Sequence, residues 1–283
     1  MKTLNPAETE QVLESYGLTT PAGTGFDFRD PMRAVHYGWH AHPYHQLLYA
    51  ISGTTQIETH AARLFLPPGR AAWIPAGLRH RTLISDVDGA SLYFAPEAVP
   101  QPGARLRILI ATPIMREMIL HALRWPQGTS AADPLAQSFF ATLALLCGEW
   151  LESELPLSLP RATSPAITRA MDRAIADPAT MTQADALAAA HMSERSFRRA
   201  FSSETGMSWQ AWLGQARILA AMALLAQGQR VTDVAADVGF QSLSAFAKAF
   251  ARLTGEVPTE YRRRATATGG HPVNAADRAA PGW

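Results

Sequence analysis

The chain has 283 residues, 47% of them hydrophobic, and a formal net charge of +1. The length is typical of two globular domains, and the hydrophobic fraction is large enough for each to bury a core. The overall charge by itself indicates no polyanionic partner, but it is unevenly distributed. Residues 161–264 carry thirteen Lys and Arg against nine Asp and Glu, a net of +4, so the rest of the chain has a net charge of −3. This basic C-terminal part favours nucleic acid as a partner.

Cys147 is the single cysteine, which excludes an internal disulfide and fits a reducing compartment. The first residues, MKTLNPAETEQ, lack the basic and then apolar pattern of a signal peptide. No apolar stretch reaches the roughly 18 residues that a membrane-spanning helix needs. We therefore expect a soluble, cytoplasmic protein with no membrane partner.

Residues 1–32 form an expected N-terminal arm with turn residues (TPAGTG), and residues 33–100 are expected to form a β domain. Runs rich in β-branched and aromatic residues, such as QLLYAI, TTQIETH, AAWIP and ASLYF, are separated by SG, PPG, PAG and DG. Several short strands at this spacing predict an antiparallel sandwich or barrel.

Three histidines occur within seven positions of this β domain, in WHAHPYHQLLYA. His40 and His42 are two residues apart, a spacing that places both side chains on one face of a strand. Such a pair is compatible with metal ligation, with effector contacts or with ordinary buried polar groups.

Residues 101–160 are expected to form a helical dimerisation or linker region, because PIMREMILHAL and PLAQSFFATLALLCGEWLESEL carry apolar residues at helical spacing. Asp133 and Pro134 are suited to begin the second of these helices. LPLSLPRATSP, at 155–165, has three prolines and is typical of a linker. The small, polar tail at 265–283 is expected to be disordered.

A repeat dominates the helical part of the sequence at residues 161–264. SERSFRRAFSSETGMSWQAW, from Ser193, matches SLSAFAKAFARLTGEVPTEY, from Ser242, at an offset of 49. Both copies follow a short alanine-rich helix, in ADALAAAH and VTDVAADVGF. The unit is therefore a short helix, a turn and a second helix with a Ser N-cap, which is the anatomy of a helix-turn-helix.

In the second helix of the first copy, Phe197 and Phe201 lie on the side opposite Arg195 and Arg199, with Arg198 on the flank. Arginines on an exposed helix can contact guanine edges or phosphates in the major groove, whereas a lone helix of this kind could equally be a solvated cationic surface. Duplication of the whole unit favours DNA binding.

Residues 166–264 resemble the DNA-binding domain of the AraC/XylS transcription regulators. The resemblance rests on Ala188, Ser193, Phe197, Phe201 and Gly206, on RILAAMALLA at 217–226, and on VTDVAADVGFQSLSAFAKAFARLTGEVPTEYR at 231–262. It implies that two helices enter successive major grooves of an operator, in a regulator that is expected to be a homodimer and to contact RNA polymerase if it activates. The implied DNA-facing residues are Arg195, Arg198 and Arg199 in the first unit, and Ser242, Leu243, Ser244, Ala245 and Lys248 in the second.

The β domain resembles a small cupin barrel of the kind that precedes AraC-type domains, on GWHAHPYHQLLYAISG and GRAAWIPAGLRH. The fold class expected is thus multidomain α+β, with an N-terminal cupin barrel plus helices and a C-terminal all-α double helix-turn-helix. By resemblance, a divalent metal (Zn, Ni, Cu or Fe) would be held by His40, His42, Gln46 and His80. Gln46 replaces the usual glutamate and would weaken the site.

The barrel interior is the expected pocket for a small effector or a metal, lined by Tyr49, Trp73 and Phe94 together with the histidines. The histidines could instead bind an effector without metal, or be structural. Two other functions stay open beside an effector-responsive regulator without enzymatic activity: a metal-dependent cupin enzyme fused to a DNA reader, and a constitutive DNA binder whose barrel only dimerises.

Overall fold

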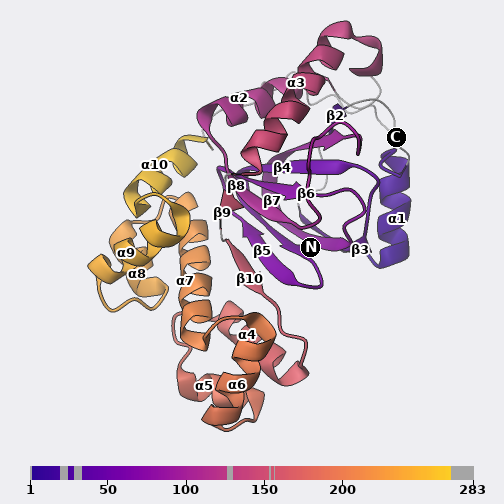
Figure 1. The fold of residues 1–283 in the computed structure, drawn as a ribbon. Coiled ribbons are helices and arrows are strands. Elements are labelled where there is room, and N and C mark those ends of the chain that lie inside the picture. Colours follow the sequence, from indigo (N-terminus) through magenta and orange to yellow (C-terminus); the bar gives the residue numbers. More distant parts are fainter. Residues whose placement is uncertain are drawn as a thin grey trace.

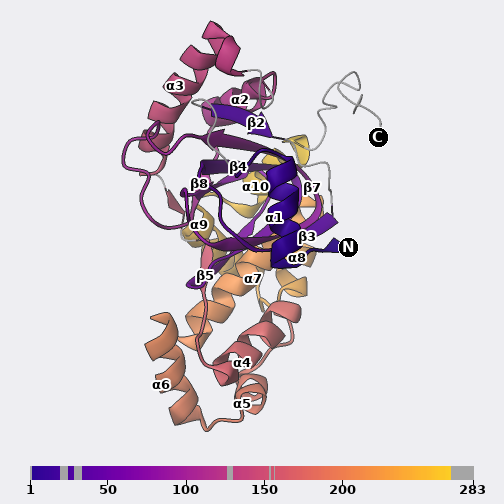
Figure 2. The same ribbon diagram turned by 90° about the vertical axis from the view of Figure 1, so that its right-hand side faces the viewer.

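A computed structural model describes residues 2–19, 25–28, 34–125, 130–152, 154–155 and 157–268. Its N-terminal part is rich in strands, and everything from α4 onward is helical (Figures 1 and 2). The ten strands belong to one sheet. Their bounds are β1 Lys2–Thr3, β2 Gly25–Phe28, β3 Ala34–His40, β4 His45–Glu58, β5 Ala62–Leu66, β6 Arg70–Ile74, β7 His80–Phe94, β8 Arg107–Ile110, β9 Glu154–Leu155 and β10 Ser158–Pro160.

The long strands β4 and β7 pair along their whole length and give the sheet its bend. The first half of β4 pairs with β6 and its second half with β5, whereas β7 pairs first with β3 and then with β2. The β4–β7 register shifts between Ala50 and Thr54, and such irregularities bend strands. The sheet therefore has two halves, β2–β7–β4–β6–β8–β9 and β1–β3–β7–β4–β5–β10, which share β4 and β7.

The expected N-terminal arm contains a helix, α1 (Pro6–Ser15), in addition to β1 and β2. Its start is a capping box: the Asn5 side chain accepts from the backbone N–H of Glu8 at 2.9 Å, and the Glu8 carboxylate accepts from Asn5 N at 2.8 Å. Pro6 occupies the first helical position, where its missing N–H is not needed. The helix packs against β3 and carries Leu13 into a small cluster with Leu18, Phe26 and Tyr93.

The region 101–160 is not purely helical, because β8, β9 and β10 extend the sheet from within it. The two expected helices are present as α2 (Pro113–Ala122) and α3 (Pro134–Trp150), with a short 3-10 turn between them at Ser130–Ala132. Asp133 caps α3, as expected, by accepting from the N–H of Leu135 at 2.8 Å. Both helices bury apolar residues against the outer face of the sheet, and Cys147 lies within that buried cluster, where burial raises the pKa of its thiol.

The helical part comprises α4 Pro165–Ala176, α5 Gln183–Ala190, α6 Glu194–Thr205, α7 Trp209–Ala226, α8 Val231–Asp237, α9 Leu243–Thr254 and α10 Pro258–Thr268. In Figure 1, α4, α5 and α6 gather at one end of α7, and α8, α9 and α10 at the other. Residues 265–268 of the expected tail continue α10, whereas residues 269–283 lie outside the described part of the chain.

A continuous apolar core joins the helical part to the sheet. Ile57, Leu64 and Leu66 of the sheet belong to the same buried cluster as Met171 of α4 and Met222 of α7. The segment expected to be a linker, 155–165, contributes to this contact, since β10 pairs with β5 while the Pro160 carbonyl accepts from the Trp212 indole N–H at 3.2 Å. No helix among the described residues is both long and apolar enough to cross a bilayer.

Candidate nucleic-acid interface and effector pocket

Helices α6 and α9 are structural copies of each other. Each has twelve residues, and each begins after a serine whose hydroxyl accepts a backbone N–H: Ser193 from Ser196 at 3.4 Å, and Ser242 from Ala245 at 3.2 Å. Each ends at a glycine in the left-handed region, Gly206 at φ 70° and Gly255 at φ 78°. The sequence repeat therefore reflects a repeated pair of helices with the same start and stop signals.

The buried faces of the two helices are also equivalent. Phe197 and Phe201 of α6 are fully buried, as are Phe246 and Phe250 of α9. The threonine that ends each helix donates its hydroxyl to a backbone carbonyl one turn earlier, for example Thr205 to Phe201 at 2.7 Å. Because the aromatic face is fixed inside each unit, the opposite face of each helix must lie outside.

Two of the three arginines predicted to contact DNA, Arg195 and Arg199, lie on that outer face of α6, and Arg198 lies on its flank. Arg195, Arg198 and Arg199 are all exposed, and none takes part in a salt bridge with a described residue. Unpaired guanidinium groups on an exposed helix are free to meet phosphates or guanine edges. Their exposure is compatible with the predicted contacts to DNA.

The corresponding surface of α9 is less polar. Ser242, Leu243, Ser244, Ala245 and Lys248 are all exposed, and the Leu243 side chain retains 46% of its accessible surface. The Ser242 hydroxyl is occupied by its capping bond. Apolar contacts to thymine methyl groups and one cationic contact are what this surface can offer to DNA.

His40, His42, Gln46 and His80, expected to lie together, meet in a pocket between the two halves of the sheet. His40 faces His80 across the β3–β7 pair, with ring centroids 4.3 Å apart, and His42 is 5.3 Å from His80. Burial is the largest influence on all three imidazoles and lowers their pKa values, that of His42 to about 4. Burial therefore favours the uncharged form of all three imidazoles.

The prediction that these residues hold a metal stays a prediction. Within the described residues, no group of three His, Cys, Asp or Glu side chains is arranged to hold a metal ion. Gln46 supplies no charge, and its amide lies 3.2 Å from His42 Nε2 and 3.0 Å from the Ser91 hydroxyl. The arrangement shown is a polar, uncharged pocket.

The structure corrects the expected lining of this pocket. Tyr49, Trp73 and Phe94 lie on the opposite face of the sheet, buried under α2 and α3. The reason is strand alternation: Gln46 and Leu48 of β4 point into the pocket, so Tyr49, an odd number of residues away from Gln46, points out of it. The apolar walls are instead Leu48, Ile84 and, from α1 and the residues after it, Leu13, Tyr16 and Leu18.

The pocket is a partly open cavity of about 80 Å³. The residues contributed by α1 were not predicted, because the sequence of the arm is polar and short. The capping pattern Asn5-Pro6-Ala7-Glu8 was the available signal for a helix there.

A second unpredicted feature links the sheet to the second helix-turn-helix. Arg70, at the start of β6, is buried with 1% of its side chain exposed and pairs with Glu256, which follows α9. Arg264 of α10 pairs with the same carboxylate at 2.8 Å and donates to the Gly69 carbonyl at 3.0 Å. Both guanidinium groups lie over the ring of the buried Tyr261, at 5.5 and 5.4 Å from its centroid.

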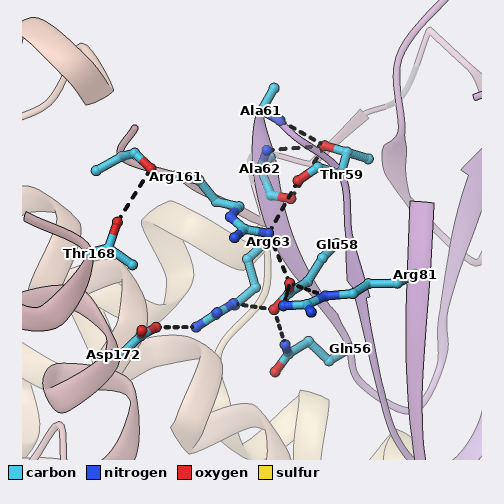
Figure 3. A network of polar contacts seen from close by, with 11 residues as sticks. Gln56, Glu58, Thr59, Ala61, Ala62, Arg63, Arg81, Arg161, Thr168 and Asp172 are labelled. Atoms are coloured by element: carbon cyan, nitrogen blue, oxygen red, sulfur yellow. Dashed lines mark hydrogen bonds and ion pairs between the residues drawn. The ribbon is translucent and has the colours of Figure 1, made fainter. Parts of the chain in front are cut away.

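The sheet also contacts the first unit through a polar network around Glu58 (Figure 3). This buried carboxylate binds Arg63 at 2.6 Å and Arg161 at 2.8 Å, and it also binds Arg81. Burial alone would raise the pKa of Glu58, but the three guanidinium groups together hold it below its usual value. Arg63 continues to Asp172 of α4 at 3.1 Å, so the network connects β4 to the helical part.

A protein with a pocket in a bent sheet, joined to two exposed helix-turn-helix units on one connecting helix, belongs to the class of ligand-controlled DNA readers. Comparison with known proteins agrees. Residues 24–159 match the family model of the AraC-like ligand binding domain, and residues 187–264 match a helix-turn-helix domain model.

The HTH-type transcriptional regulator NimR of Escherichia coli (strain K12) is 29% identical over 235 residues, covering 80% of this chain and 82% of the relative. RipA of Corynebacterium diphtheriae, also an HTH-type transcriptional regulator, is 31% identical over 150 residues, or 50% of this chain and 44% of RipA. The DNA-binding domain of AdpA, solved with a target DNA, is 32% identical, with a TM-score of 0.35, over 37% of this chain and 96% of that one. The chain belongs to the AraC family of DNA-binding transcriptional regulators and carries a ligand-binding N-terminal domain.

Proposed function

We propose that this regulator senses a small molecule in the pocket around His40, His42 and His80 and transmits its presence to the second helix-turn-helix. The observation that carries the proposal is the continuity between pocket and reader. Gln46 in the pocket pairs through β4 with Ile74 of β6, and the same strand begins with Arg70, the buried partner of Glu256. A shift of β4 on effector binding would therefore reach α9 and α10 through one short strand.

The test begins with an operator selected from random DNA by the full chain. Affinity for it is then measured by fluorescence anisotropy at fixed salt, with and without candidate effectors. An effector that changes operator affinity in the wild type, but not in Arg70→Met, supports the proposal. A response that is undiminished in Arg70→Met contradicts the route through β6. Operator affinity that no ligand alters favours the constitutive alternative.

A divalent metal is the second candidate occupant: the ring centroids of the three imidazoles lie 4.3 to 6.3 Å apart, although the described side chains as placed form no metal-ligand group. Metal sensing predicts that purified protein contains Zn, Ni, Cu or Fe, and that a chelator changes operator affinity. His42→Ala would abolish both effects. We propose no enzymatic activity, since the relatives are transcriptional regulators and none of the described residues that line the pocket offers a carboxylate as acid or base.

We further propose that the protein acts as a homodimer in the cytoplasm, contacting RNA polymerase where it activates. Support for the dimer comes from exposed apolar side chains on α2 and α3: Ile114, Leu135 and Leu145 each retain about 60% of their accessible surface. Dimers would engage two operator half-sites and gain affinity through effective concentration. Analytical sedimentation of the wild type and of Leu145→Glu tests this. If the wild type sediments as a dimer and the variant as a monomer, the dimer interface includes α3.

A further inference from the structure

The hydrogen bonds of the pocket histidines fix which ring nitrogen carries the proton. Nδ1 of His40 lies 2.7 Å from the Gly38 carbonyl, Nδ1 of His42 lies 2.8 Å from the Tyr44 carbonyl, and Nδ1 of His80 lies 2.9 Å from the Leu78 carbonyl. A carbonyl oxygen can only accept, so each Nδ1 must donate. In an uncharged imidazole, Nε2 is then a bare acceptor at the far edge of the ring.

The same assignment orients Gln46. As placed, the Gln46 amide oxygen lies 3.2 Å from His42 Nε2 and the amide NH₂ donates to the Ser91 hydroxyl at 3.0 Å. Because a bare His42 Nε2 and an amide oxygen would both be acceptors, we assign the amide the flipped orientation, in which its NH₂ donates to His42 and its oxygen accepts from Ser91. His42 is thereby satisfied. His40 Nε2 and His80 Nε2 make no hydrogen bond with any described residue, although their rings are 4.3 Å apart and both line the pocket.

The remaining lining sets the charge and shape of what fits. None of the fifteen described residues around the pocket is Asp, Glu, Lys or Arg. Beside these residues a charged ligand would lose its hydration without meeting an opposite charge from any of them, which is unfavourable. Leu13, Leu48 and Ile84 supply apolar walls around the two acceptors.

We propose that the effector is an uncharged molecule with two neighbouring N–H or O–H donors on one edge and an apolar or aromatic body. The donors would reach His40 Nε2 and His80 Nε2, and the body would contact the leucine and isoleucine walls. This inference rests on the proposed sensing function of the same pocket. It goes beyond that function by favouring uncharged hydrogen-bond donors over carboxylates, phosphates and amines as effectors.

The test uses four probes of similar size on the full-length protein, with affinities measured by calorimetry. Catechol has two adjacent hydroxyl donors, veratrole is its donor-free dimethyl ether, benzoate is an anion and benzylamine is a cation. Catechol should bind at least about tenfold more tightly than each of the others, because its two hydrogen bonds to buried acceptors would otherwise stay unmade. Equal or tighter binding of veratrole, benzoate or benzylamine overturns the proposal, as does failure of catechol to bind at millimolar concentrations.

Two variants complete the design. His80→Phe keeps a ring and removes the acceptor, so it should lower catechol affinity by about tenfold, whereas His60→Phe, at an exposed histidine outside the pocket, should leave it unchanged. NMR correlation of ring protons with ring nitrogens gives a readout that needs no variant. Unprotonated Nε2 on His40 and His80 in the free protein is expected, and protonated Nε2 on either contradicts the proposal.

Operator affinity is measured in parallel to separate this inference from the sensing function. Selective catechol binding without any change in DNA affinity would uphold the pocket chemistry and contradict the proposed sensing. Zn²⁺ that binds the three imidazoles and displaces catechol would overturn the proposal, because the lone pairs would then be metal ligands.

Discussion

Glu256→Gln is the perturbation that tests the contact between the sheet and the second helix-turn-helix most sharply. It keeps the shape of the side chain and removes the negative charge that Arg70 and Arg264 share. Arg70 has 1% of its side chain exposed, and its remaining neighbours are weak acceptors, with the Thr254 carbonyl 3.5 Å and the Gly69 carbonyl 3.4 Å away. The variant would therefore leave a buried cation without a counter-charge.

Breaking a buried ion pair in this way costs about 3–5 kcal/mol. We expect the lower end, about 3 kcal/mol, because Glu256 is 23% exposed and a glutamine oxygen can still accept one hydrogen bond. Arg70→Met should cost less, since it removes the buried charge and leaves Glu256 paired with Arg264. The contrast between the two variants identifies the uncompensated cation as the cause.

Urea denaturation of the full chain, followed by tryptophan fluorescence, measures these differences. Glu260→Gln is the matched control, because Glu260 pairs with Arg263 on the exposed surface of α10, the helix that follows Glu256, and its loss should cost at most about 1 kcal/mol. If Glu256→Gln is no more destabilising than Glu260→Gln, or if Arg70→Met is the more damaging change, the reasoning about this contact is refuted.

Three further predictions follow from the site. Arg199→Ala should weaken binding to the selected operator by about 1–3 kcal/mol and reduce its salt dependence, measured by anisotropy at several salt concentrations; unchanged affinity would remove Arg199 from the interface. Because the pKa of Glu58 lies below its usual value, its stabilising effect should be present at neutral pH and lost as the pH falls through the folded-state pKa. Glu58→Gln should thus be less stable than wild type at neutral pH and approach it in acid, and a constant difference would contradict this. Phe250→Ala, in the core of the second unit, should cost about 3–5 kcal/mol in the same denaturation assay, and a loss under 1 kcal/mol would show that the unit is not packed as described.

The helical part could be predicted almost completely from the sequence, because its signals are local and repeated. The offset of 49 residues places Ser193 on Ser242 and Gly206 on Gly255, and these residues are the start and stop signals of α6 and α9. Within each helix, the spacing of the two phenylalanines identifies the buried face. In α6 this predicts which arginines are exposed.

The pocket could be predicted only in part. The resemblance to the cupin motifs placed His40 and His42 correctly beside His80, but their spacing wrongly put both on one strand, because β3 ends at His40. The predicted aromatic lining was wrong, because large aromatic side chains of these strands also pack on the opposite face of the sheet. Tyr93, opposite Gln46 in the β4–β7 pair, lines the pocket, whereas its neighbour Phe94 is on the other face. Successive residues of a strand point to opposite faces, so the pairing of Gln46 with Tyr93 puts Tyr93 on the pocket face and Phe94 on the other.

The contact between Arg70 and Glu256 joins residues that are 186 positions apart, and no local pattern indicates it. An arginine at the start of a strand is ordinarily a surface residue. Its burial depends on where the helical part packs against the sheet, which is a property of the tertiary structure alone.

Chemical footprinting of the full-length protein on its selected operator tests the central claim most directly, that α6 and α9 together read DNA. Within each half-site, protection should appear at two major-groove segments on one face of the duplex, about 34 Å apart. Arg199→Ala should weaken the first segment alone, and Lys248→Ala the second. A single protected segment, or two segments that respond equally to both variants, would contradict the assignment of one helix to each groove.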